Sequence, residues 1–261
     1  MTYERTRLTA DTTFYASPSG AGRQDGSDTS NPFAGVQAAW DALQRDYDLN
    51  GWTATIQLMD GVYSAGLQAY GPMLGLHKPG GSPVIIKGNP SNAANVAFNT
   101  PGVNTFSFDG GAVATIVLLT GSASGASIFY ATNGAMIEYG SCRFGTANAH
   151  VYADVSGRTI CTGSCDIVQG ANFHIVANSG QAGIVPGVNL SFAPGLSFAG
   201  QFVYTRDGGV ARIPIPAVTF SGSFSGQKGY ASILGIIDCS GGANSIPGSI
   251  DCGANYGGQV Y

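Results

Sequence analysis

Charged residues are scarce in this chain. Only 10% of its 261 residues are Asp, Glu, Lys or Arg, whereas ordinary globular domains carry about 25%. Eleven Lys and Arg residues against 15 Asp and Glu residues give a formal net charge of −4, and the basic residues form no cluster. Because non-specific nucleic-acid binding needs a basic stripe, the composition predicts no nucleic-acid partner.

Long apolar runs are also absent from the sequence. None approaches the roughly 20 residues of a membrane-spanning helix, and the first residues, MTYERTRLTADTTFY, lack the apolar segment of a secretory signal peptide. We therefore expect no membrane insertion and synthesis in a cytoplasm. The five cysteines are odd in number and lack zinc-finger spacing, so we expect free thiols, no metal site and no other cofactor.

Glycine and short β-prone segments dominate what remains. Gly makes up 40 of the 261 residues, about twice its usual share. From TATIQLM onward, β-prone segments alternate with turn clusters and no helix separates them, which argues against βαβ units. One helix is predicted earlier. Its apolar residues recur every three or four positions, with Asn31 and Pro32 as the start signal and Asn50-Gly51 as the stop; they are Phe33, Val36, Trp40, Leu43 and Tyr47.

A repeat of about 23 residues runs through the middle of the chain. Gly140-Ser141-Cys142 recurs as Gly163-Ser164-Cys165, and the same offset aligns apolar residues in columns. One column is Phe144, Ile167, Leu190 and Ile213; another is Phe106, Phe129, Tyr152, Ile175 and Phe198. Like residues stack in this way in a parallel β-helix, where each turn of chain is one rung. A β-sandwich, the structural alternative, would not predict a fixed offset.

The sequence therefore predicts an all-β fold, a single-stranded parallel β-helix with rungs of about 23 residues. Right-handed coiling follows from the general preference of parallel crossovers. Residues 1–31 form an N-terminal arm and first strand, 32–51 a capping helix, and 52–226 the β-helix. Residues 227–261 form a Gly-rich segment for packing or oligomerisation.

A polar column lies one residue before the first apolar column, so its side chains are expected on the outer face. Its members are Arg143, Asp166, Asn189 and Arg212. Such a row can bind sugar hydroxyls or carboxylates, since Arg holds carboxylates bidentately; the alternative is a solvated ladder between strands. Tyrosines outside the apolar columns, among them Tyr130, Tyr204 and Tyr230, are candidates for stacking on carbohydrate or for subunit contacts.

Catalytic signals are weak. Paired carboxylates about 5–10 Å apart carry out acid–base glycoside chemistry, and the candidates are Glu138, Asp154, Asp166 and Asp207. The repeat separates Glu138 from Asp207 by three rungs, about 14 Å, and leaves Asp154 without an acidic neighbour. His150 and His174 are separated by one residue more than the repeat, so they are expected on opposite faces, which argues against a metal pair.

Two stretches resemble a known family. TTFYASPSGAGRQDGSDTSNPFAGVQAAWDAL resembles the opening of pectin-lyase-like parallel β-helix proteins, and PVIIKGNPSNAANVAF resembles their first-rung motif. LTADTTFY near the start, together with NSIPGS and GGQ near the end, is similar to small virion proteins of tailed phages and gene transfer agents, such as head spikes, fibres and tail spikes.

This resemblance implies a right-handed, homotrimeric β-helix on the virion that contacts other virion proteins and host surface polysaccharide. The leading interpretation is a non-enzymatic spike or fibre subunit that mediates adsorption. One alternative is a polysaccharide-degrading lyase or hydrolase of the tailspike type. Another is a structural adaptor that seats a second spike protein on the particle.

Overall fold

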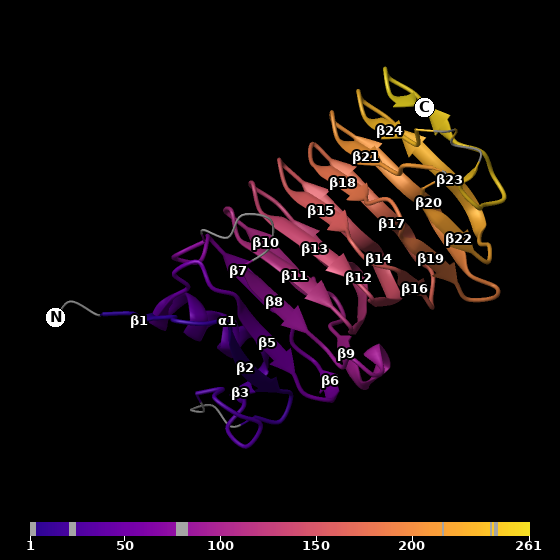
Figure 1. Ribbon diagram of the computed structural model, residues 1–261. Coiled ribbons are helices and arrows are strands. Elements are labelled where there is room, and N and C mark those ends of the chain that lie inside the picture. Colours follow the sequence, from indigo (N-terminus) through magenta and orange to yellow (C-terminus); the bar gives the residue numbers. More distant parts are fainter. Residues whose placement is uncertain (1–3, 21–24, 77–82, 216, 241, 243–244) are drawn as a thin grey trace.

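The computed structural model describes residues 4–20, 25–76, 83–215, 217–240, 242 and 245–261. One 11-stranded sheet runs the length of the molecule (Figure 1). In spatial order its strands are β3 (Phe33–Ala34), β2 (Thr12–Ser17), β5 (Ala54–Leu58), β8 (Val84–Lys87), β11 (Val113–Val117), β13 (Met136–Gly140), β15 (Arg158–Cys161), β18 (Gln181–Ile184), β21 (Val210–Arg212), β24 (Ile236–Asp238) and β26 (Gln259–Val260).

A second sheet of 13 strands covers the other sides of the coil. Its strands are β6 (Gly61–Tyr63), β7 (Leu67–Tyr70), β9 (Val96–Asn99), β10 (Phe106–Asp109), β12 (Thr120–Ala131), β14 (Arg143–Asp154), β16 (Cys165–Ile167), β17 (Ala171–Asn178), β19 (Asn189–Phe192), β20 (Ser197–Arg206), β22 (Thr219–Ser221), β23 (Ser225–Ala231) and β25 (Gly253–Ala254). A short 3₁₀ helix, η1 (Ala93–Asn95), precedes β9, and β1 (Thr6–Arg7) pairs with β4 (Tyr47–Asp48).

The long strands turn a corner within this second sheet. The start of β14 pairs with β16, whereas the rest of β14 pairs with β17. Each turn of the chain therefore passes along three faces, one in the 11-stranded sheet and two in the 13-stranded sheet. Its strands pair in parallel with those of the next turn. This arrangement confirms an all-β, parallel β-helical coil, visible as stacked arrows in Figure 1.

The fixed offset predicted from the sequence holds only locally. Phe106 pairs with Phe129 and Phe144 with Ile167, as predicted. The pairing of β12 with β14 contains irregularities, however, so Phe129 lies beside Val151 rather than Tyr152. In the later turns the separation grows, because Ile175 pairs with Val203 and not with Phe198. The columns therefore predicted which residues point into the core better than they predicted which residues pair between neighbouring strands.

Aromatic rings fill the interior of the coil. Phe129 lies 5.7 Å from Phe106 and 5.6 Å from Phe144 between ring centroids, and all three side chains are buried. Further along, Phe202 stacks 4.8 Å from His174 and 4.9 Å from Phe224. Alternation along each strand places these residues inside and their neighbours outside. The outer face of the strands is therefore free to carry polar and tyrosine side chains.

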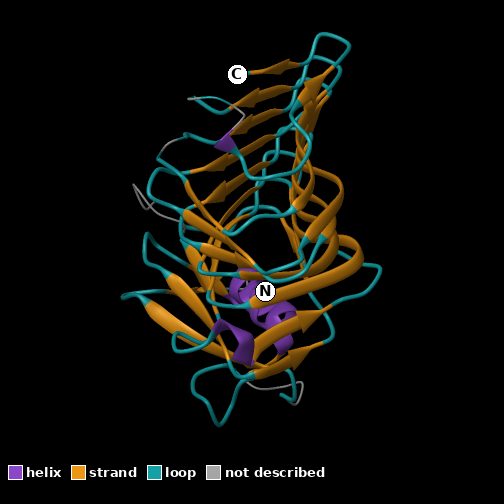
Figure 2. Ribbon diagram, turned by 90° about the vertical axis from the view of Figure 1, so that its right-hand side faces the viewer, coloured by secondary structure: helices purple, strands orange, loops and turns teal. Residues whose placement is uncertain are grey.

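Helix α1 (Gly35–Asp46) covers the N-terminal end of the coil (Figure 2). Of the predicted stripe it buries Val36, Trp40 and Leu43, and the Trp40 ring meets that of Phe108 at 5.3 Å. The predicted bounds of 32–51 are wrong at both ends, because Phe33–Ala34 pair with β2 as strand β3 and Tyr47–Asp48 pair with β1 as strand β4. The residue preceding the helix is Ala34, without a side-chain cap, so Asn31 does not cap it.

The C-terminal residues continue the two sheets. Strands β23 and β25 extend the 13-stranded sheet, and β24 and β26 extend the 11-stranded one. Leu234 and Tyr256 are 67% and 79% exposed at this end. Across the described ranges, the structure contains no helix with the length and hydropathy needed to cross a membrane.

Candidate functional site

A row of tyrosines follows the outer face of the 13-stranded sheet. Tyr130 pairs with Tyr152 across β12 and β14, and Tyr204 pairs with Tyr230 across β20 and β23. Val176 of β17 lies between the two pairs. All four tyrosines are partly exposed. Four steps between strands give the row a length of about 19 Å, so it spans several units of an extended ligand.

The rings form stacked or tilted groups along this row. Tyr204 stacks on Phe173 at 5.4 Å and 22°, and on Tyr230 at 6.4 Å and 29°. Tyr130 and Tyr152 lie 5.5 Å apart with a tilt of 47°. We call these five residues the tyrosine face. Its rings offer both flat apolar surface and hydroxyl groups.

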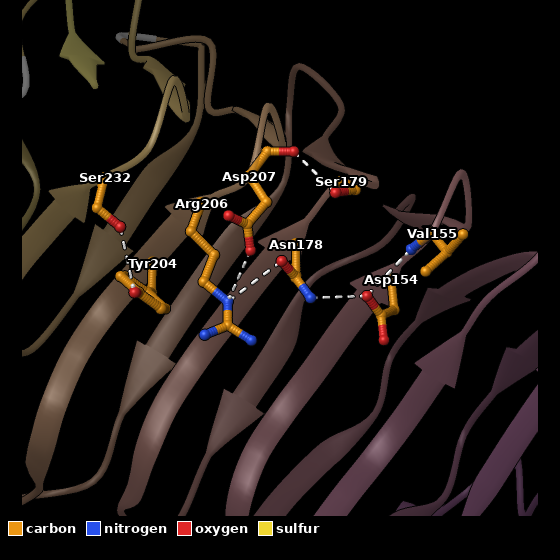
Figure 3. A network of polar contacts seen from close by, with 8 residues as sticks. All are labelled: Asp154, Val155, Asn178, Ser179, Tyr204, Arg206, Asp207 and Ser232. Carbon is orange, nitrogen blue, oxygen red and sulfur yellow. Dashed lines mark hydrogen bonds and ion pairs between the residues drawn. The ribbon is translucent and has the colours of Figure 1, made fainter. Parts of the chain in front are cut away.

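A ladder of polar side chains borders the tyrosine face at the ends of three strands (Figure 3). Asp154 pairs in register with Asn178, and Asn178 with Arg206. The Asn178 amide donates to Asp154 Oδ1 at 2.8 Å, and Arg206 Nε donates to Asn178 Oδ1 at 3.2 Å. These three residues are the polar ladder. The contacts fix their side chains before any ligand arrives, which lowers the entropy lost on binding.

Two further contacts join the ladder to its surroundings. The Tyr130 hydroxyl donates to Asp154 Oδ2 at 2.8 Å, which ties the tyrosine face to the ladder. Arg206 Nε lies 3.5 Å from Asp207 Oδ2, and the Ser179 hydroxyl donates to the Asp207 carbonyl at 2.7 Å (Figure 3). The face and the ladder therefore form one connected surface.

Tight turns after the strands hold the ladder in place. The Gly157 N–H donates to the Asp154 carbonyl at 2.6 Å, and the Gly209 N–H donates to the Arg206 carbonyl at 2.8 Å. Each turn contains a left-handed residue, with φ of 62° at Ser156 and 52° at Asp207. The turns end the strands at equivalent heights, which aligns Asp154, Asn178 and Arg206 across the sheet.

The local environment keeps the tyrosine hydroxyls protonated. Burial, followed by the hydrogen bond to Asp154, raises the pKa of Tyr130 to about 12. Burial also raises the pKa of Tyr152, and the Asp154 charge adds to this while Arg206 opposes it. Both hydroxyls are therefore neutral at physiological pH. The Tyr130 proton is held by Asp154, so its oxygen is left as an acceptor. Neutral hydroxyls beside a carboxylate, an amide and a guanidinium suit the binding of sugar hydroxyls.

No protein-family model, curated protein or solved structure matches this chain. Among the residues that the structure describes, no three His, Cys, Asp or Glu side chains form a group that could hold a metal ion. The tyrosine face with its polar ladder is best suited to binding a polar ligand with flat apolar surfaces.

The predicted polar column is only partly assembled. Arg143 does lie beside Asp166, with Nε and Oδ2 3.9 Å apart, but their side chains are 34% and 56% exposed and such solvated pairs contribute little. Asn189 faces Thr219, whose hydroxyl donates to it at 3.1 Å, and Ser191 takes the predicted place next to Asp166. Arg212 lies in the 11-stranded sheet beside Gly183, so the four residues are not one column.

The candidate carboxylates are also rearranged. Glu138 lies in the 11-stranded sheet and accepts a hydrogen bond from Thr115 at 3.0 Å, so it does not share a column with Asp207. Asp154 and Asp207 instead belong to one network, joined through Asn178 and Arg206. The structure therefore brings two acids together that the predicted repeat kept apart.

The prediction that His150 and His174 lie on opposite faces of the strands is wrong. His150 and His174 both point into the core, with their Nδ1 atoms 2.9 Å apart. His150 Nε2 bonds the Gly145 carbonyl at 2.9 Å, and His174 Nε2 has no hydrogen-bond partner in the described part of the chain. The two rings meet because the offset between β14 and β17 exceeds the predicted repeat by one residue, which is also the excess that separates the histidines.

Sequence reasoning missed Tyr152 and Asn178 as members of the site and gave Arg206 no definite place. The fixed offset assigned Tyr152 to the interior, whereas the structure places it beside Tyr130 on the outside. Tyr130, Tyr204 and Tyr230 were identified as stacking candidates because they lie outside the apolar columns, and all three lie on one face. Asn178 and Arg206 each end a strand, which is the signal that could have located them.

Proposed function

We propose that the protein binds an extended polysaccharide through the tyrosine face and the polar ladder, without cleaving it. One observation carries this proposal: partly exposed, stacked rings lie beside a pre-ordered row formed by Asp154, Asn178 and Arg206. The apolar face of a sugar ring stacks on Tyr204 while its hydroxyls reach the ladder. Successive sugar units follow the strand spacing, so many shallow contacts add up.

The wider role that we propose is a spike or fibre subunit on a phage-like particle. The resemblance of the opening residues to pectin-lyase-like virion proteins supports this role, as does the stiffness of a continuous coil. The proposal includes a right-handed coil, with rungs of about 23 residues where Phe106 meets Phe129 and Phe144 meets Ile167. It also includes a homotrimer, in which three copies of the face would bind host polysaccharide with higher avidity than one.

Binding and chain length should be measured together on bacterial surface polysaccharides. The wild-type protein is expected to bind and leave chain length unchanged. Tyr204→Ala should weaken binding about two- to tenfold, since an aromatic contact contributes about 0.5–1.5 kcal/mol. Tyr256→Ala is the matched control, because Tyr256 is 79% exposed in the C-terminal region, off the face. Equal loss in both variants, or no binding by the folded oligomer, would refute the proposal and favour the adaptor.

A second candidate function is hydrolysis by Asp154 and Asp207. Asp154 and the neighbouring Arg206–Asp207 segment lie two strand steps apart, about 10 Å, close to the spacing of inverting glycosidases. Both Asp154 oxygens, however, already accept hydrogen bonds from Tyr130 and Asn178, whereas a general acid must donate a proton. Polysaccharide chains that are shortened by wild type but stay intact with Asp154→Asn would establish this alternative.

A further inference from the structure

Two cysteines meet inside the coil at one of its corners. Cys161 ends β15 and Cys165 begins β16, and only Thr162, Gly163 and Ser164 separate them. Their Sγ atoms lie 3.9 Å apart, and both side chains are buried. Both thiols also reach the Gly163 carbonyl oxygen, at 3.2 Å from Cys161 and 3.3 Å from Cys165. The corner therefore brings two sulfur atoms into contact.

The neighbouring turns place other residues at the same two corner positions. In strand register, the turn before this pair has Tyr139 and Cys142, and the turn after has Ile184 and Leu190. A single buried cysteine in such a place acts as a small apolar residue. Of these three turns, only the middle one has a thiol on each side of the corner. Packing alone does not require such a pair.

Backbone hydrogen bonds hold this corner on both sides. The Ser141 N–H donates to the Ser164 carbonyl at 2.8 Å, which fixes the corner to the turn before it. The Val185 N–H donates to the Cys161 carbonyl at 2.9 Å, which fixes it to the turn after. A disulfide has a sulfur–sulfur distance of about 2.0 Å. The two sulfur atoms must therefore approach by roughly 2 Å, which rotation about the two Cα–Cβ bonds can provide.

The two thiols differ in acidity. The hydrogen bond from Cys165 lowers the pKa of Cys161, and the same contact, followed by burial, raises the pKa of Cys165. Because the thiolate is the nucleophile in sulfur chemistry, Cys161 is the sulfur that attacks first. Within the described ranges, no third His, Cys, Asp or Glu completes a metal-binding group with this pair. The arrangement therefore favours chemistry between the two sulfur atoms.

We propose that Cys161 and Cys165 form a disulfide when the protein meets a hydroperoxide, and that this bond ties β15 to β16 and stabilises the coil. The Cys161 thiolate attacks one oxygen of hydrogen peroxide and the O–O bond breaks. The released hydroxide takes up the proton that Cys161 had lost, which gives a sulfenic acid and water. The Cys165 sulfur then attacks the sulfenic sulfur, the S–O bond breaks, and the hydroxide leaves with the Cys165 proton as a second water.

The oxidant reaches the pair through the turn between the two strands. Thr162 and Ser164 are exposed, whereas Cys161 and Cys165 are buried. Hydrogen peroxide is close to water in size, so a local opening of this turn admits it. The pair lies inside the coil, so the proposal does not depend on the tyrosine face or on polysaccharide binding.

Tryptic mapping of the reduced full chain after treatment with hydrogen peroxide tests the proposal. Cleavage after Arg158 and Arg206 gives peptide 159–206, which contains Cys161 and Cys165 and no other cysteine, whereas Cys142 falls in peptide 88–143. Folded wild type, alkylated in denaturant after treatment, should give peptide 159–206 unalkylated and lighter by two hydrogen atoms. Dithiothreitol should reverse this change. Half conversion should need about a tenth of the peroxide that oxidises Cys142, or less.

Two variants separate this pair from the third buried thiol. Cys142→Ser is the matched control, because the Cys142 thiol instead contacts the carbonyls of Gly140 and Ile116, so the disulfide should form as in wild type. Cys165→Ala should form no disulfide in peptide 159–206 and should leave a sulfenic acid on Cys161 that dimedone traps. A disulfide that links peptide 88–143 to peptide 159–206, or two alkylated thiols in peptide 159–206 once Cys142 is oxidised, would overturn the proposal.

Urea unfolding measures the effect of the bond on the coil. A disulfide constrains the unfolded chain, so oxidised wild type should unfold at a higher urea concentration than the reduced protein. Cys142→Ser should show the same shift, and Cys165→Ala should show none. An unchanged or lower midpoint in oxidised wild type would refute the stabilising bond.

Discussion

The buried pair His150 and His174 should make the protein sensitive to mild acid. Burial lowers the pKa of His150 to about 3. Burial, with the neighbouring His150, lowers the pKa of His174 well below its usual value. Both rings therefore stay neutral in the folded protein at pH 5. In the unfolded chain each histidine has a pKa of about 6.5 and takes up a proton.

The size of the effect follows from proton linkage. The unfolded state binds more protons below pH 6.5, so stability falls as pH decreases from there toward the folded-state pKa values. Between pH 7 and pH 5, each histidine lowers the free energy of unfolding by about 1.9 kcal/mol. The pair should therefore account for a loss of about 3.8 kcal/mol. Carboxylates add little in this window, because their ordinary pKa values lie near 4.

Urea unfolding at pH 7 and pH 5, followed by intrinsic fluorescence, measures this loss. His174→Phe is the informative variant, because a phenyl ring can keep the stacking on Phe202, which lies 4.8 Å away at 9°. The variant retains one buried histidine, so its loss should fall to about 1.9 kcal/mol. A loss equal to that of wild type, or no loss in wild type, would refute the buried neutral pair.

Three other predictions follow from the packing. Trp40→Ala should lower the free energy of unfolding by about 3–5 kcal/mol in urea titration, because Trp40 is buried between helix α1 and the coil; a change below about 1 kcal/mol would contradict a capping role. Gly157→Ala should destabilise by about 1–3 kcal/mol, since its Cβ would lie 2.1 Å from the Ala131 carbonyl oxygen, whereas Gly183→Ala should be neutral. In thiol labelling, half-buried Cys252 should react first, and Cys142, whose pKa burial raises to about 12, should react only after unfolding.

Much of the fold could be predicted from the sequence because inward positions repeat. Stacked rungs place like residues on one another, so Phe106 and Phe129 recur at a constant separation wherever no residue is inserted. The helix was predictable for the same reason, since its buried side chains recur every three or four positions. Its start was not, because the pairing of Phe33–Ala34 with β2 depends on a contact distant in sequence.

The outer face was harder to predict because small irregularities accumulate. Thr120 pairs with Arg143 at the predicted offset, but further along the same two strands Tyr130 pairs with Tyr152, one residue short of that offset. A shift of one residue moves a side chain to the opposite face of a strand. That single step is enough to turn Tyr152 from an expected core residue into part of the tyrosine face. The prediction of buried residues is less sensitive to an offset that is wrong by one, because most apolar side chains of these strands point into the core.

Glycines in the turns indicate how successive rungs align, which a fixed period does not. Gly157, Gly180 and Gly209 each begin a return to the 11-stranded sheet, and a Cβ atom on any of them would lie 2.1–2.6 Å from a carbonyl oxygen of the neighbouring turn. Glycine fits such an approach without a clash, so these positions mark one point of the later rungs, whereas Ala112 and Ala135 take the equivalent place in two earlier ones. Counting back two or three residues from each glycine reaches Asn178, Asp154 and Arg206. Aligning rungs on their glycines therefore assembles the polar ladder, although the step from Asn178 to Arg206 is longer in sequence than the step from Asp154 to Asn178 and no constant period fits both.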